Sequence, residues 1–253
     1  MTGGLIARLH LTPSLSLFYA EFYFRAGFHM ELIDTFFNWS ILVESFPILL
    51  RGLGNTLLLG CTAIVFGCIW GLLLCMMRLY GGRFFRYLAI FYIDIFRALP
   101  ILVVLILIYY ALPLAGIRFS SFTSAAIALS MVLGAFTAEV CRAGIENISR
   151  GQFEAAAALG LPFWTTMRKV ILPQAIKVVV PPLTSNCVSI YKDTSLASVV
   201  AMPDLLKQAT DAQALMANPT PLIGAALIYL AFLWPLVRLV SYLEERGKRQ
   251  MAR

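Results

Sequence analysis

Two pairs of oppositely charged residues interrupt stretches of this chain that are otherwise apolar. Asp94 precedes Arg97 by three residues, and Glu139 precedes Arg142 by the same interval. Carboxylates inside a membrane can relay protons or bind a cation, which would make this chain an ion-coupled carrier. Residues three apart on a helix can instead neutralise each other. The spacing favours local ion pairs, Asp94 with Arg97 and Glu139 with Arg142, over an ion pathway.

Other reactive groups do not form a catalytic or metal-binding set. Cys61, Cys68 and Cys75 recur every seven residues, which separates them by about 10 Å along a helix, too far for a disulfide or a shared metal. His10 and His29 have no partner at ligand spacing. The sequence contains no G-x-x-x-x-G-K-[ST] loop for nucleotide phosphates. We therefore expect no enzymatic activity, no metal and no cofactor on this chain.

The composition is that of a membrane protein with several spans. Of 253 residues, 60% are hydrophobic and 13% are charged, and the mean hydropathy is +0.82. Soluble domains carry about 25% charged residues, and a bilayer-crossing helix needs about 20 apolar residues. The sequence predicts an all-α polytopic fold of about five spans. They are Asn55–Met77, Ala98–Ile117, Phe119–Ala138, Val178–Tyr191 and Asn218–Val237, the fourth needing Gln174–Lys177 to reach across.

Basic residues predict the orientation of these spans, because cytoplasmic loops carry the excess of Lys and Arg. The segments after the first, third and fifth spans hold three, five and five of the twenty Lys and Arg residues. This predicts an external N-terminus and a cytoplasmic C-terminus. A basic face beside anionic lipid accounts for the net charge of +7 without nucleic acid.

The predicted spans divide the chain into three parts. Residues 1–45 are predicted to be an N-terminal extension, with 1–29 dispensable and a second start at Met30, followed by an interfacial stretch over Leu32–Leu50. Residues 46–245 form the transmembrane domain, and residues 246–253 form a basic cytoplasmic tail.

The loop between the third and fourth spans, residues 149–173, is predicted to contain a short helix that docks onto another protein. Ser149 and Gln152 have the spacing of a capping box, and Gly160 provides a left-handed stop. Alanines 155–158 give this helix a face of little bulk, while Glu154 provides a charge. A helix lying on lipid would favour Lys, Arg and bulky apolar residues instead. A second short helix is expected over Pro162–Val170, ending at Pro173.

This loop resembles the EAA loop of bacterial ABC-importer permeases. Glu154-Ala155-Ala156, Gly160 and the later Ile171-Leu172-Pro173 follow that pattern. The run Lys192-Asp193-Thr194-Ser195-Leu196 and the Phe96-Arg97-Ala98-Leu99-Pro100 segment are similar to motifs of the polar amino acid permeases. Asn186 departs from the expected pattern by one position.

The resemblance implies a permease subunit of the bacterial inner membrane that imports a polar amino acid by alternating access. The implied partners are a second permease subunit, an extracytoplasmic binding protein and a cytoplasmic ATPase dimer that binds ATP and Mg. Glu154, Ala155, Ala156 and Gly160 would contact the ATPase. The alternative is an ion-coupled amino acid carrier or channel without an ATPase.

Helix breaks near the middle of the membrane are the expected place for substrate, because they free backbone groups. Pro100 and the Pro181-Pro182 pair are the expected break points. Polar residues near the second break are the candidates for lining the substrate path: Thr184, Ser185, Asn186 and Ser189. They could equally bond to the backbone one turn away. The residues with structural or gating roles implied by the family motifs are Arg97, Pro100, Glu139, Arg142, Lys192, Asp193, Thr194 and Ser195.

Overall fold

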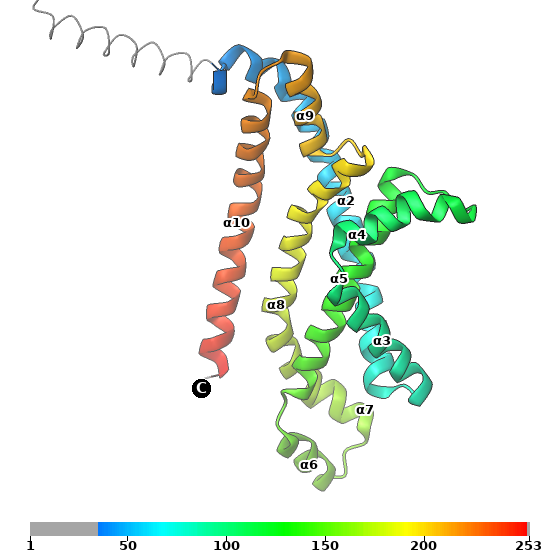
Figure 1. Cartoon of the computed structure of the whole chain (residues 1–253). Helices are drawn as coiled ribbons and strands as arrows, with labels where there is room; N and C mark the ends of the chain where they lie inside the picture. The colour runs from blue at the N-terminus through cyan, green and yellow to red at the C-terminus, as the bar shows by residue number, and fades with distance from the viewer. Residues whose placement is uncertain (1–34, 252–253) are drawn as a thin grey trace, which may run out of the picture.

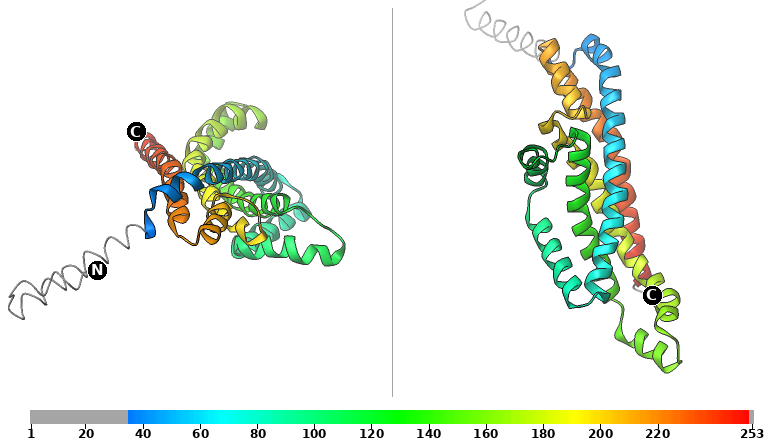
Figure 2. Two further views of the ribbon diagram at one scale, coloured as in Figure 1. Left: turned by 90° about the horizontal axis from the view of Figure 1, so that it is seen from above. Right: turned by 90° about the vertical axis from the view of Figure 1, so that its right-hand side faces the viewer.

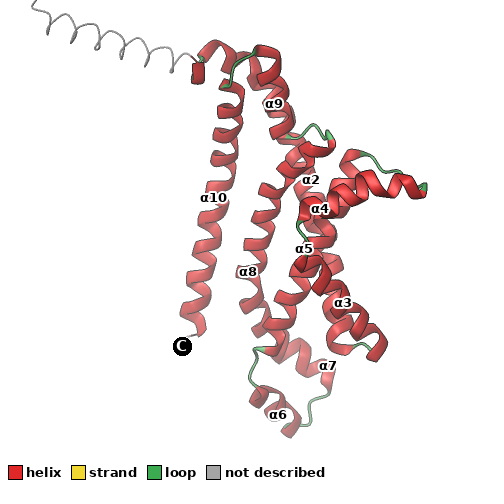
Figure 3. Cartoon of the chain, in the orientation of Figure 1, coloured by secondary structure: helices red, strands yellow, loops and turns green. Residues whose placement is uncertain are grey.

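The structure is a computed structural model that describes residues 35–251, with side chains described up to residue 245. All regular secondary structure in this part of the chain is helical (Figure 3). The main helices are α2 (Trp39–Tyr80), α3 (Arg83–Ala98), α4 (Ile101–Ile106), α5 (Ser121–Glu146), α6 (Arg150–Ala158), α7 (Phe163–Thr166), α8 (Leu172–Asp193), α9 (Leu205–Met216) and α10 (Thr220–Met251). The predicted extension over residues 1–29 lies outside the described residues.

Helices α2 and α5 pack closely along their length and form the centre of the bundle (Figures 1 and 2). Their backbones approach at glycines: a Cβ added at Gly71 would lie 2.7 Å from the carbonyl oxygen of Gly134. Small residues allow this approach in membrane helices. The first predicted span lies wholly within α2, which begins at Trp39. The predicted interfacial stretch, Leu32–Leu50, lies partly outside the described residues, and from Trp39 onward it belongs to the same helix as that span.

The chain bends sharply between α3 and α4, at the start of the predicted second span Ala98–Ile117. The two segments Arg83–Ala98 and Ile101–Ala115 meet at an angle of 105°. The break follows from Pro100, which disfavours helical backbone in the residue before it. Leu99 accordingly has extended backbone, with φ −83° and ψ 134°. Pro100 is therefore a break point, as expected, and the predicted second span corresponds to the segment that follows it, Ile101–Ala115.

Three described helices are long and apolar enough to cross a membrane: Trp39–Tyr80, Ser121–Glu146 and Thr220–Glu245. The bent pair of α3 and α4 would make a fourth if it forms one span. The predicted fourth span corresponds to α8, which does not meet the same test of length and hydropathy. Helix α8 lies against α5 and α10 and contains polar residues on more than one face.

Helix α8 departs from the sequence predictions at its prolines. The predicted end of the second loop helix at Pro173 is wrong, because α7 continues through a π-helical segment, Met167–Ile171, directly into α8. The wider π turn accommodates a residue that lacks an N–H group. The predicted break at Pro181-Pro182 is also wrong, since α8 runs through both residues. Gln174–Lys177 belong to α8, as expected.

Helix α9 caps the opposite end of the bundle from α6 (Figure 1). The buried carboxylate of Asp204 caps α9 by accepting hydrogen bonds from the N–H groups of Leu206 and Lys207. The hydroxyl of Thr56 accepts from the N–H of Leu205 at 3.0 Å and joins this cap to α2. Burial raises the pKa of Asp204 to about 6.

Candidate functional site

Helix α6 forms a tip that projects beyond the ends of α2 and α5 (Figure 1). The N–H of Gly151 donates to the Ser149 hydroxyl at the start of the helix. Gly160 has a φ of 71°, in the left-handed region that favours glycine. The predicted cap and stop are therefore present, and the helix has nine residues. The second half of the predicted capping box differs: the Gln152 side chain accepts from Gln174 rather than from the Ser149 backbone.

The predicted alanine face of α6 is only partly exposed. Glu154, Ala155 and Gly160 are exposed, whereas Ala156 is buried and supports the helix from inside. Large apolar side chains follow the helix: Leu159 is 78% exposed and Trp164 is 81% exposed. Neither Leu159 nor Trp164 was among the contact residues predicted from the sequence. The apolar run from Leu159 to Trp164, within a basic loop, was the signal that could have found them.

The tip is connected to the bundle by packed side chains. Met167, Ile171 and Ala175 form a buried cluster with Ile148, and Phe153 of α6 packs against this cluster. The Tyr80 ring, at the end of α2, meets the Phe163 ring edge to face with 5.8 Å between centroids. Packed side chains therefore connect the loop that carries α6 and α7 to α2 and α8.

A cluster of charges lies where α2, α3 and α5 meet. Glu139 accepts a hydrogen bond from Nη1 of Arg78 at 2.9 Å and from Nε of Arg142 at 3.1 Å. Nη1 of Arg97 lies 3.9 Å from Glu139 Oε2. The predicted Glu139–Arg142 pair is confirmed. The predicted Asp94–Arg97 pair is wrong: Arg97 turns toward α5, and Asp94 is exposed with no ion pair among the described residues.

Arg97 also lines a cavity of about 350 Å³ between the α3–α4 break, α5 and α8. Of the residues predicted to matter, this cavity brings together Arg97, Pro100, Asn186, Ser189 and Asp193. Its remaining lining is apolar, from Leu99, Ile101, Val132, Leu133, Phe136 and Ile190. Within the described structure no ion pair joins Arg97 to Asp193. The cavity therefore presents a cation and a carboxylate together with an amide and a hydroxyl.

The other predicted path and motif residues do not line this cavity. The Thr184 hydroxyl donates to the Val180 carbonyl at 2.7 Å, which is the backbone-bonding alternative. Thr194 and Ser195 donate to the carbonyls of Tyr191 and Lys192, also at 2.7 Å, where α8 gives way to a 3₁₀ segment. Lys192 is exposed. Ser185 is half-buried outside the cavity lining.

Nearly the whole described chain is similar to a known protein family and to individual known proteins. Residues 32–249 match the family described as "Binding-protein-dependent transport system inner membrane component". The glutamate/aspartate import permease protein GltK of Escherichia coli is 36% identical over 219 residues, covering 83% of this chain and 98% of that protein. The probable glutamine ABC transporter permease protein GlnM of Bacillus subtilis is also 36% identical, over 214 residues, covering 83% of this chain and 97% of that protein.

Solved structures resemble the fold as well. The crystal structure of an amino acid ABC transporter with histidines has a TM-score of 0.76 at 35% identity, covering 81% of this chain and 96% of that chain. An inward-facing conformation of the MetNI methionine ABC transporter has a TM-score of 0.60 at 22% identity, covering 80% of this chain and 94% of that chain. The second likeness concerns the fold alone.

Proposed function

We propose that the α6 tip couples a partner ATPase to transport, because this chain belongs to the family of binding-protein-dependent ABC transporter permeases for polar amino acids. The chain is a multi-pass protein of the bacterial inner membrane. Such permease subunits are not enzymes themselves, so the energy for import is supplied by another subunit.

The end of the bundle that carries α6 is the cytoplasmic end in this proposal. The α2–α3 turn, the α6 tip and the end of α10 lie at the same end (Figures 1 and 2). These are the three segments that hold most of the Lys and Arg residues, and such segments stay in the cytoplasm. The start of α2 and helix α9 are then outside.

The single observation that carries the coupling proposal is the shape of the α6 tip. A nine-residue helix is too short to be stable alone, yet this one projects from the bundle. This helix carries the exposed Glu154 carboxylate, and the loop that follows carries the exposed Leu159 and Trp164 side chains. A helix that inserts into a groove of a partner uses a combination of apolar anchors and a charged contact.

The partner at this tip is a cytoplasmic ATPase dimer, which binds ATP and Mg. An extracytoplasmic binding protein delivers the amino acid to the outer end, and a second permease subunit completes the path. Movement of the ATPases would pull on α6, and the buried cluster of Ile148, Met167, Ile171 and Ala175 would carry that movement to α2 and α8. This is rigid-body rocking around a site in the membrane.

The cavity beside the α3–α4 break is the proposed site for the amino acid within this subunit. A free amino acid carries a carboxylate and an ammonium group. Arg97 can bind the first with paired hydrogen bonds, and Asp193 can accept from the second. Asp193 has no ion pair within the described residues, and Arg97 has only the 3.9 Å contact of its Nη1 with Glu139, which leaves further guanidinium N–H groups for a ligand.

The test is to purify the chain together with the ATPase and binding protein encoded beside its gene, and to reconstitute them in vesicles. We expect ATP hydrolysis that rises when the loaded binding protein is present. Uptake driven by an ion gradient, with no associated ATPase, would support the ion-coupled carrier instead.

A further inference from the structure

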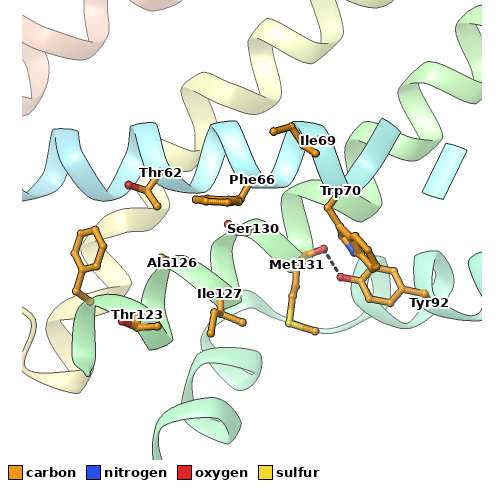
Figure 4. A pocket seen from close by; sticks show the side chains of 11 residues that line it. Thr62, Phe66, Ile69, Trp70, Tyr92, Thr123, Ala126, Ile127, Ser130 and Met131 are labelled. Atoms are coloured by element: carbon orange, nitrogen blue, oxygen red, sulfur yellow. Dashed lines mark hydrogen bonds between the residues drawn. The ribbon is translucent and has the colours of Figure 1, made fainter. Parts of the chain in front are cut away.

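Two cavities of the described structure differ in whether their polar groups already have partners. One, of about 540 Å³, lies between α2, α3 and α5 (Figure 4). Tyr92, Thr62 and Ser130 in its lining each donate a hydrogen bond to a backbone carbonyl, and the Thr123 hydroxyl lies 2.9 Å from that of Ser120. The hydroxyl groups of this cavity are therefore already used within the chain.

The smaller cavity, of about 350 Å³, contains polar groups without partners. Its lining includes the Asn186 amide and the Ser189 hydroxyl in addition to Arg97 and Asp193. Neither Asn186 nor Ser189 forms a side-chain hydrogen bond with any other described residue. Ser and Thr side chains in helices commonly bond to a carbonyl of the preceding turn, as Thr184 does at 2.7 Å. Asn186 and Ser189 are therefore free to bind a ligand in the cavity.

Three of these four polar residues lie on one face of α8. Asn186, Ser189 and Asp193 are spaced by three and four residues, which places them in one row along the helix. Asn186 is about 10 Å from Asp193 along the helix axis, and Ser189 lies between them. In the binding mode proposed above, the ammonium group of the amino acid contacts Asp193 and its carboxylate contacts Arg97. The side chain of that amino acid can then extend along α8 toward Ser189 and Asn186.

The charges of this cavity restrict which side chain fits. Arg97 and Asp193 are the charged residues of its lining, one cation and one anion, and the α-carboxylate and α-ammonium groups use both. An ionised side chain would then be desolvated among apolar residues without an opposite charge, which costs free energy. An apolar side chain would instead leave the Asn186 amide and the Ser189 hydroxyl unpaired. A neutral side chain that both donates and accepts hydrogen bonds avoids both costs.

A carboxamide meets this requirement most fully. The Asn186 amide has an NH₂ donor and a carbonyl acceptor, so it can pair with a second carboxamide through two hydrogen bonds. The Ser189 hydroxyl can donate to or accept from the remaining groups. We propose that Asn186 determines specificity in this subunit by selecting an amino acid with a carboxamide side chain, a proposal that rests on the amino acid site proposed above.

Direct binding to the permease tests this selection without the binding protein, whose own pocket would otherwise contribute. The complex of the full chain with its ATPase is purified, and the binding of tritiated glutamine, glutamate, lysine and methionine is measured in separate samples. Glutamine and glutamate differ only in the replacement of an amide by a carboxylate. Because sites that hydrogen-bond a substrate group discriminate strongly against analogues that lack it, we expect glutamine to bind with at least about tenfold higher affinity than each of the other three.

Asn186→Asp should change the preference from glutamine to lysine, because it adds an unpaired carboxylate where the side chain of the ligand lies. A gain of lysine binding cannot result from misfolding. Asn186→Leu should remove the preference for glutamine over methionine. The matched control is Asn147→Asp, at an exposed position at the end of α5 and outside the cavity, which should keep the preference of the unmodified chain.

Two contrary outcomes are distinguishable. If Arg97→Gln weakened the binding of all amino acids but the unmodified chain bound glutamate or lysine as tightly as glutamine, the amino acid site would remain and the selection by Asn186 would be wrong. The same would follow if both Asn186 variants kept the preference of the unmodified chain. If the unmodified chain bound none of the four amino acids, or if Arg97→Gln left binding unchanged, the amino acid site and the selection would both be overturned.

Discussion

Nη1 of Arg78 lies 2.9 Å from Oε2 of Glu139 and ties the end of α2 to α5. Arg142 binds the same carboxylate, and Arg97 approaches it from α3. The Glu139 carboxylate thus partly neutralises the charges of three arginines, which come from three different helices. Each of Arg78, Glu139 and Arg142 is about one-fifth exposed, so the charges are only partly hydrated.

Glu139→Ala should destabilise the chain. Removing one partner of a buried ion pair costs about 3–5 kcal/mol, and the partial exposure here lowers our expectation to about 2 kcal/mol. Thermal unfolding of the purified chain in detergent measures the effect as a drop of several degrees in Tm. Glu154→Gln, an exposed carboxylate at the tip, is the control and should leave Tm unchanged. An unaltered Tm in Glu139→Ala would mean that the cluster contributes nothing to stability.

Glu154→Lys should abolish coupling while the protein remains inserted in the membrane. The substitution reverses the charge on the exposed face of α6, and we expect at least a tenfold loss of uptake with the normal amount of protein in the membrane. Glu244→Lys reverses an exposed charge on α10, near the end of the bundle that carries α6, and serves as the control. Full uptake in Glu154→Lys would remove this carboxylate from the proposed contact.

Gly160→Trp should reduce coupling by a different route. A residue with a Cβ is strained at a φ of 71°, at a cost of about 1 kcal/mol or more. The bulk of the indole would also change the exposed surface beside Leu159. ATP hydrolysis of the reconstituted complex should lose its response to the binding protein. Gly54→Trp, in an open position on α2 with helical backbone, is the comparison and should keep that response.

The local signals of the sequence predicted the α6 tip well. Ser149, Gly160 and Pro100 act through the backbone of their own neighbours, so their effects could be read from the sequence. The ion-pair partner of Arg97 could not be predicted from the sequence. Asp94 is close in sequence, but the orientation of α3 against α5 turns Arg97 toward Glu139, and that orientation depends on packing across the bundle.

The prolines show a second limit. Pro100 breaks the chain and Pro181-Pro182 do not, although all three lack an N–H group. Helix α8 is held on several sides by α5, α10 and α2, which stabilises it despite the lost hydrogen bonds. The Arg97–Asp193 cavity likewise joins residues almost a hundred positions apart, and only the arrangement of α3, α5 and α8 brings them together.

Acidic pH should stabilise the outer end of the bundle through Asp204. Burial raises the pKa of Asp204 from 3.8 to about 6. Between pH 3.8 and pH 6, Asp204 is therefore mostly protonated in the folded chain and mostly ionised in the unfolded chain. The free energy of unfolding should therefore fall as pH rises from about 4 to about 6, by as much as about 3 kcal/mol. Nearby Lys207 lowers the pKa and partly offsets the burial.

Asp204→Asn isolates this contribution, because an amide can accept the same cap hydrogen bonds without a charge. The variant should unfold at a higher temperature than the unmodified chain at pH 7.5, and the difference should shrink as the pH falls and disappear below about pH 3.8. Asp211→Asn, on the exposed face of α9, is the control and should show no comparable convergence. A constant difference between Asp204→Asn and the unmodified chain across this range would contradict the assignment.

Asp193→Asn and Arg97→Gln should each impair transport at the substrate step rather than at the coupling step. Either change removes one of the two charges that would bind the amino acid, and a hydrogen bond to a charged group contributes about 1.5–3 kcal/mol, or roughly a 10- to 150-fold change in affinity. Uptake should fall while ATP hydrolysis still responds to the binding protein. Lys192→Gln, next to Asp193 but exposed and outside the cavity, should transport normally. If the Asp193→Asn and Arg97→Gln variants transported as well as the Lys192→Gln variant, the cavity would not be the amino acid site. If these two variants lost both uptake and stability, the role of Asp193 and Arg97 would be structural.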